Sequence, residues 1–197
     1  MTLHILALSG SLRAGSHNRQ LAETAVQLAP DGVAVELYEG LAAIPFYNED
    51  TDHPDTVPAA AAALRDAAAR ADAIMLFTPE HNGTMSAVLK NAIDWLSRPH
   101  GAGALAAKPV AVLSATFGQY GGVWAQAEAR KALGVAGAVV IEDVDLAVRS
   151  SADRFAHAHP RDDAEVAAAL REAVHRTARS AGPAVPAVPA AVPAVAA

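Results

Sequence analysis

The stretch that decides the fold is LHILALSGSLRAGSHN, residues 3–18. It opens with an apolar run, Leu3 to Leu8, of the kind that forms a strand buried on both faces. A loop with two glycines follows. Residues 18–29 then carry apolar side chains at helical spacing, preceded by Ser16, a residue type that caps helices. A strand, a short loop and a helix in this order predict the first half of a β-α-β unit, from which parallel sheets are built.

The rest of the chain repeats this alternation. We predict further strands at residues 33–38, 73–77, 109–114 and 138–141, and helices at residues 57–70, 86–97, 123–133 and 163–180. Strands that alternate with helices form a parallel sheet covered by helices on both faces. Five such strands predict an α/β three-layer sandwich whose parallel sheet has the flavodoxin-like order 2-1-3-4-5.

Composition limits the classes of function. With 197 residues, 52% hydrophobic and 18% charged, the chain is expected to be globular, and its net charge of −6 argues against a nucleic-acid partner. No apolar stretch reaches the roughly 18 residues that cross a bilayer, so we expect no membrane partner. The first residues run into a strand without a basic region, which predicts a cytoplasmic protein. Cysteine is absent, which excludes disulfides and thiolate catalysis.

The end of the chain differs from the rest because residues 182–197 repeat Pro, Ala and Val. Proline lacks an amide donor and interrupts helices. We therefore divide the chain into a flavodoxin-like domain, residues 1–181, and a tail, residues 182–197, that we predict to be disordered.

The loop after the first strand has the chemistry of a phosphate site. It lies where ligands bind in parallel α/β sheets, outside the carboxyl ends of the strands. Ser11, Ser16 and Asn18 offer hydroxyl and amide groups, and Arg13 offers a charged fork that suits a phosphate. The start of the next helix adds free amides and a partial positive charge. A surface turn with ordinary caps is the simpler interpretation, but this donor set favours a phosphate monoester.

Two nucleotide motifs fail at this loop. Gly10 and Gly15 have the spacing of a Walker A loop, but Ser16 and His17 stand where Lys and Ser or Thr are required. The G-x-G-x-x-G fingerprint of dinucleotide-binding folds is also absent. No lysine is therefore placed to reach a β- or γ-phosphate, and a Rossmann NAD fold is not expected.

The loop after the third strand suits a flat heteroaromatic ring. Pro79 and Gly83 favour a compact turn, and the ring is expected to stack on His81 and to hydrogen-bond along its polar edge to the main chain. The helix that follows carries Asn91, Asp94 and Trp95, which we interpret as packing or capping residues.

Residues 10–18 and 79–98 together resemble the NADPH-dependent FMN reductase family, which includes quinone, chromate and azo reductases. The family's first loop reads Gly-Ser-Leu-Arg, two residues, Ser, one residue, Asn. Its second reads Pro-Glu-Tyr-Asn, followed by a helix with Leu-Lys-Asn-Ala-Ile-Asp-Trp-Leu-Ser-Arg. Residues 44–48 and 114–122 are similar to two further family loops. His81 departs from the pattern, since it stands at the family's tyrosine, and we expect it to tune the flavin environment.

The resemblance implies non-covalently bound FMN, with its phosphate on Ser11, Arg13, Ser16 and Asn18. It also implies that residues 79–84 line the isoalloxazine ring, that Thr116 and Gly118 close its other edge, and that Gly121 leaves room beside it. The full set of expected cofactor-binding residues is Ser9, Ser11, Arg13, Ser16, His17, Asn18, Pro79, Glu80, His81, Asn82, Gly83, Thr84, Ser114, Thr116, Gly118 and Gly121.

The implied function is an oxidoreductase that follows a ping-pong cycle. NADPH or NADH delivers a hydride to the flavin and leaves, and a small acceptor (a quinone, azo compound, metal oxyanion or free flavin) is then reduced. The flavin carries this chemistry, so we assign no catalytic residue and no metal ligand. A homodimer is expected, with a tetramer as the alternative.

Three other functions stay open. The chain is alternatively an electron carrier without NAD(P)H activity, a flavoenzyme dedicated to one biosynthetic substrate, or a subunit that has lost FMN. His157 and His159, with acids nearby, suggest a metal site, although loop histidines without a metal are commoner.

Overall fold

The computed structural model describes residues 2–182. The predicted disordered tail therefore lies outside the described residues, apart from Gly182. No helix within the described range is both long enough and apolar enough to cross a membrane.

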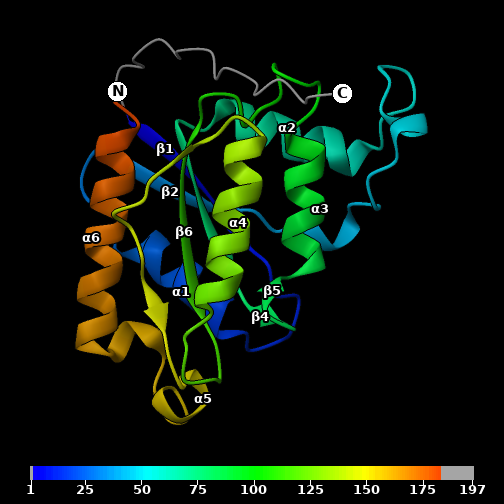
Figure 1. Cartoon of the computed structure of the whole chain (residues 1–197). Coiled ribbons are helices and arrows are strands. Elements are labelled where there is room, and N and C mark those ends of the chain that lie inside the picture. The colour runs from blue at the N-terminus through cyan, green and yellow to red at the C-terminus, as the bar shows by residue number, and fades with distance from the viewer. Residues whose placement is uncertain (1, 183–197) are drawn as a thin grey trace, which may run out of the picture.

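A parallel sheet forms the centre of the molecule (Figure 1). Its strands lie in the order β2 (Val33–Leu37), β1 (Leu3–Ser9), β3 (Ala73–Thr78), β6 (Pro109–Ala115) and β7 (Val139–Val140). Each neighbouring pair is parallel. In chain order this is 2-1-3-4-5, so the predicted topology is confirmed.

The fifth position of the sheet differs from the prediction. Instead of one strand at residues 138–141, two short strands, β7 and β8 (Ala147–Val148), pair with successive parts of β6. Between them the chain leaves the sheet with a Glu-Asp-Val-Asp run, residues 142–145. Acidic residues fit poorly in a sheet interior, whereas Val144 turns inward and is buried. The second strand brings residues 147–155 back toward the carboxyl ends of the other strands.

Helices cover both faces of the sheet. α1 (His17–Gln27) and α6 (Ala164–Ser180) lie on one face, and α2 (Ala59–Arg70), α3 (Ala87–Leu96) and α4 (Val123–Val135) lie on the other (Figure 1).

The sequence of β1 accounts for this layering. Ile5 and Ala7 belong to the buried cluster under α1 and α6, whereas Leu6 and Leu8 belong to the cluster under α2, α3 and α4. Side chains alternate between the two faces of a strand, so an unbroken apolar run places one core on each side.

Helix starts follow the expected capping chemistry. The hydroxyl of Ser16 accepts a hydrogen bond from the amide of Arg19 at 3.3 Å, as predicted for the start of α1. The hydroxyl of Ser86 caps α3 in the same way, and the carboxylate of Asp163 caps α6.

Several short elements were not predicted. They are a hairpin of β4 (Glu80–His81) and β5 (Thr84–Met85), the one-turn helix α5 (Ser151–Arg154), and the 3-10 turns η1 (Leu41–Ala43), η2 (Glu49–Thr51) and η3 (Pro160–Asp162). The hairpin had a sequence signal, because Asn-Gly at residues 82–83 favours a turn with two positive φ angles. Asn82 and Gly83 have φ angles of 54° and 76°.

The loop between β2 and α2 is fixed by α3. The indole N–H of Trp95 donates to the carbonyl of Pro45 at 2.8 Å. The amide of Asn91 accepts from the N–H of Tyr47 at 2.8 Å and donates to the same Pro45 carbonyl at 3.0 Å. Asn91 and Trp95 are therefore packing residues, as predicted.

Candidate functional site

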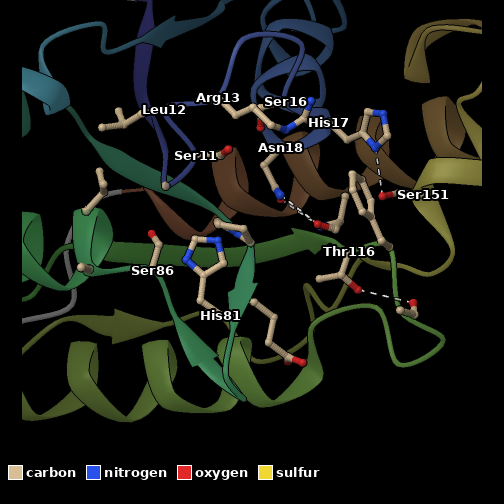
Figure 2. Close-up of a pocket in the computed structure, with 18 of the residues that line it drawn as sticks. Ser11, Leu12, Arg13, Ser16, His17, Asn18, His81, Ser86, Thr116 and Ser151 are labelled. Atoms are coloured by element: carbon tan, nitrogen blue, oxygen red, sulfur yellow. Dashed lines mark hydrogen bonds between the residues drawn. The ribbon is translucent and has the colours of Figure 1, made fainter.

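A cavity of about 600 Å³ opens at the carboxyl ends of β1, β3 and β6 (Figure 2). This is the edge where open α/β sheets bind ligands, and the volume lies within the range of small-molecule sites. The predicted residues that line it are Ser11, Arg13, Ser16, His17, Asn18, Pro79, Glu80, His81, Thr116 and Gly118. Residues from three separate loops therefore converge on one cavity.

The first of these loops approaches α3 closely at Gly10. A Cβ on Gly10 would lie 2.6 Å from side-chain atoms of Leu89 and from the hydroxyl oxygen of Ser86. Only glycine fits there without displacing these neighbours, so the sequence allows the loop to turn directly over the start of α3.

This loop offers unused hydrogen-bond donors. The backbone amides of Ser11, Leu12 and Arg13 have no hydrogen-bond partner within residues 2–182. The Arg13 guanidinium is exposed, donates to the carbonyl of Ala14 at 3.1 Å, and has no carboxylate partner in the same range. Free amides, a helix start and an unpaired guanidinium together form an anion site.

Asn18 lines the cavity, but its amide serves the fold. Nδ2 donates to the carbonyl of Ala115 at 2.8 Å, and Oδ1 accepts from the amide of Ala115 at 2.9 Å. The residue is 4% exposed. These two bonds tie the start of α1 to the end of β6 and use Oδ1 and one of the two Nδ2 hydrogens, so the implied phosphate contact stays a prediction.

His17 also contacts a distant part of the chain. Its Nδ1 lies 3.0 Å from the hydroxyl of Ser151 (Figure 2). Its ring packs edge-on against Phe117 and Phe155. Burial, and secondarily the charge of Arg13, lower the pKa of His17. The imidazole is therefore favoured in its neutral form at neutral pH.

The second loop carries a hairpin into the cavity. Pro79, Glu80 and His81 line the cavity. The carboxylate of Glu80 accepts from the amide of Ala125 at 3.1 Å. Because the N-cap residue of α4, Gly122, has no side chain, Glu80 supplies the missing cap and links the hairpin to α4.

The remaining residues predicted in this loop lie elsewhere. Asn82 and Thr84 face a second cavity of about 850 Å³ beside α3 and α4. Gly83 forms the tip of the hairpin turn, where its positive φ is required.

The predicted residues of the third loop have two roles: some line the cavity, and others hold the loop in place. Thr116 and Gly118 line the cavity. Ser114 does not, because its hydroxyl donates to the carbonyl of Gly121 at 2.5 Å and accepts from the side chain of Gln126 at 2.7 Å. Gly121 has a φ of 69° and packs against the Ala147 backbone, where a Cβ would lie 2.8 Å from the carbonyl oxygen.

Ser9 lies outside the cavity lining as well. It is buried at the end of β1, and its hydroxyl has no hydrogen-bond partner among the described residues.

Nine lining residues were missed from sequence: Gly10, Leu12, Ser86, Ala87, Val88, Ala115, Phe117, Tyr120 and Ser151. Ser86 had a capping signal. Phe117 and Tyr120 are exposed aromatic residues in a loop after a strand, a position that often carries function. Ser151 had no local signal, since it reaches the site only through the second half of the split strand.

Of the two histidines considered as metal ligands, His159 caps a turn, and His157 has no hydrogen-bond partner within residues 2–182. The ring of His159 accepts from the amide of Arg161 at 3.2 Å and caps η3. Within residues 2–182, no three His, Asp or Glu side chains converge in the way that a metal site requires.

The chain is similar to known flavin reductases. A family described as NADPH-dependent FMN reductase matches residues 3–153. An NAD(P)H-dependent FMN reductase of Pseudomonas aeruginosa is 41% identical over 131 residues, which cover 66% of this chain and 69% of the relative. A 2-hydroxy-1,4-benzoquinone reductase of a Burkholderia species is 33% identical over 155 residues, 79% of this chain and 83% of the relative.

The solved structures give the same result. FerB, a flavoenzyme NAD(P)H:(acceptor) oxidoreductase of Paracoccus denitrificans, superposes with a TM-score of 0.80 at 27% identity, over 91% of this chain and 97% of FerB. The family match spans the three loops that form the cavity, and it ends beside Ser151. The chain belongs to the NADPH-dependent FMN reductase family.

Proposed function

We propose that the cavity binds FMN non-covalently, with the phosphate on residues 11–16 and the ring between the β4–β5 hairpin and residues 116–120. The observation that carries the proposal is the donor set of the first loop. Its free amides, the start of α1 and the unpaired Arg13 match a dianionic phosphate and lie in one cavity of about 600 Å³. The residues present therefore fit the group.

The chain is an oxidoreductase that uses NAD(P)H. FMN, when bound, supplies the acceptance of a hydride from the nicotinamide and the release of two electrons to an acceptor. The protein's own residues bind the cofactor and orient it in the cavity. The first loop neutralises phosphate charge, and the hairpin and the third loop form opposite walls of the cavity.

The acceptor is a small molecule. Relatives are named quinone reductase and 2-hydroxy-1,4-benzoquinone reductase, and we infer a quinone-like acceptor for this chain. Leu12, Phe117 and Tyr120 line the cavity and are exposed, which favours a flat apolar molecule over a hydrated oxyanion.

We further propose a cytoplasmic homodimer. The second cavity, beside α3 and α4, is lined by Val135, which is 81% exposed, and by charged side chains that include Lys90, Asp94, Glu128 and Lys131. His81 lines both cavities. A second copy seated there would cover the exposed Val135 and border the flavin site.

The phosphate assignment is tested by comparing FMN with riboflavin, which lacks the phosphate. Replacing Arg13 with alanine removes one charge-assisted interaction, worth about 1.5–3 kcal/mol, so FMN affinity should fall about 10- to 100-fold. Riboflavin affinity should fall much less, because riboflavin lacks the phosphate and Arg13 meets the ring wall only through Phe117. Arg171→Ala, an exposed arginine on α6, is the matched control and should leave both affinities as they are. Equal losses for FMN and riboflavin in Arg13→Ala would refute the assignment.

A further inference from the structure

Two side chains that lie far apart in sequence meet at one edge of the cavity. His17, the first residue of α1, and Ser151, the first residue of α5, approach to 3.0 Å between Nδ1 and the hydroxyl (Figure 2). Both residues line the cavity. The contact therefore joins the phosphate loop to the returning segment of the split strand.

Ser151 is buried and directly follows a residue in a costly backbone conformation. It is fully buried, and its hydroxyl has no other hydrogen-bond partner within the described chain. The preceding residue, Ser150, has a φ of 45°, in the left-handed region that non-glycine residues seldom adopt. Such conformations persist where the surroundings impose them, and they cluster at functional sites.

The segment that carries Ser151 is bound to the third loop by main-chain hydrogen bonds. The amide of Thr116 donates to the carbonyl of Val148 at 3.0 Å, and the amide of Ser151 donates to the carbonyl of Thr116 at 2.9 Å. The amide of Ser150 donates to the carbonyl of Gly118 at 3.0 Å. Three main-chain hydrogen bonds therefore join residues 148–151 to residues 116–118.

Aromatic packing tightens the same link. The His17 ring lies 5.2 Å from the ring of Phe155 and 5.7 Å from that of Phe117, with the planes steeply inclined. Phe117 belongs to the third loop, and the Arg13 guanidinium lies 5.7 Å from its ring centre. A displacement of Phe117 would therefore change its contacts with both His17 and Arg13.

The far end of α5 is anchored independently. The guanidinium of Arg154 pairs with the carboxylate of Asp163 at 2.5 Å and with that of Glu165 at 2.7 Å. Because α5 is a single turn, this anchor limits how far Ser151 can move away from His17.

We propose that His17 and Ser151 form a latch that holds residues 116–120 in place against the ring of the bound flavin. The pair positions the loop and contacts no reacting atom. The latch rests on the proposed function, since the ring lies against this loop only if the cavity binds FMN. It also predicts that His17 acts on the ring half of the site and is not a phosphate ligand.

The test uses Ser151→Ala, His17→Leu and the double variant in the full chain. Thr177→Val is the matched control, because it removes another fully buried hydroxyl, which donates to the carbonyl of Ala173 at 2.8 Å on α6. Hydrogen exchange of residues 116–120 is measured without flavin, and the dissociation constants of FMN and riboflavin are measured by titration.

Each latch variant should speed exchange in residues 116–120 and weaken FMN and riboflavin by a similar factor, about tenfold for one lost hydrogen bond. The double variant should be no worse than the weaker-binding single variant, because both remove the same contact. The control should change neither measurement.

Two results would overturn the latch. Wild-type exchange in residues 116–120 in the single variants would show that the contact holds nothing. A loss of affinity for FMN alone would make His17 a phosphate ligand instead. If the unmodified protein binds neither flavin, the proposed function fails, and the exchange rates still decide whether the latch exists.

Discussion

The change of Asn18 to alanine separates a structural tether from a ligand contact. The side chain is 4% exposed and makes two hydrogen bonds, to the amide and to the carbonyl of Ala115. Alanine would leave both groups of Ala115 buried and unpaired. An unsatisfied buried group costs about 1–3 kcal/mol, so the free energy of unfolding should fall by about 3 kcal/mol.

The assay is urea unfolding followed by tryptophan fluorescence and circular dichroism, with a thermal scan alongside. For a domain of this size, 1 kcal/mol corresponds to about 2–4 °C, so Tm should fall by about 6–12 °C. Flavin affinity should fall to the same extent for FMN and for riboflavin, because the tether holds the end of β6 and not the phosphate.

Asn91→Ala is the matched control. Its amide also bridges main-chain groups, those of Tyr47 and Pro45, but it is partly exposed and lies outside the cavity. It should cost less stability, about 1 kcal/mol, and leave flavin affinity unchanged. An Asn18→Ala protein of normal stability that loses affinity for FMN alone would refute the tether and restore the phosphate contact.

Three further predictions concern acid stability and packing. Arg154 lowers the pKa of Asp163 to about 2 from 3.8, so the ion pair stabilises the fold above pH 4, and the free energy of unfolding should fall by about 2 kcal/mol between pH 4 and pH 2. Asp163→Asn should remove this pH dependence when the free energy of unfolding is measured across the acid range. The lowered pKa of His17 means that the unfolded chain takes up its proton first, so stability should decline below about pH 6.5, and His17→Gln should flatten that part of the same titration. Gly10→Ala should destabilise by about 1–3 kcal/mol in urea unfolding, because its Cβ would lie 2.6 Å from Leu89.

The layered fold follows from patterns that lie within short stretches of the sequence. The unbroken apolar run of β1 forces a core on each side, and Ser16 and Ser86 mark helix starts by their chemistry. These features depend on residues close in sequence, which is why they were predictable. The hairpin has an equally local signal: Gly83 predicted a compact turn, and the Asn82-Gly83 pair is typical of a two-residue hairpin turn.

The site was less predictable where roles depend on distant partners. An amide such as that of Asn18 suits a phosphate or a main-chain tether equally well, and only the position of Ala115 in the fold reveals the tether. Ser114 and Gly121 likewise hold the third loop in place without lining the cavity, because the Ser114 hydroxyl donates to the carbonyl of Gly121. Ser151 enters the cavity because β8 returns to β6 after an acidic excursion, and nothing near it in sequence indicates that path.

The most direct test of the central claim is one spectroscopic titration. The purified protein is loaded with FMN, its visible spectrum is recorded without oxygen, and NADPH and NADH are added in separate runs. The account predicts a bound oxidised-flavin spectrum that bleaches within seconds and recovers when a quinone is added. A flavin that binds but is bleached by neither nicotinamide would indicate an electron carrier, and a protein that binds no FMN would contradict the account.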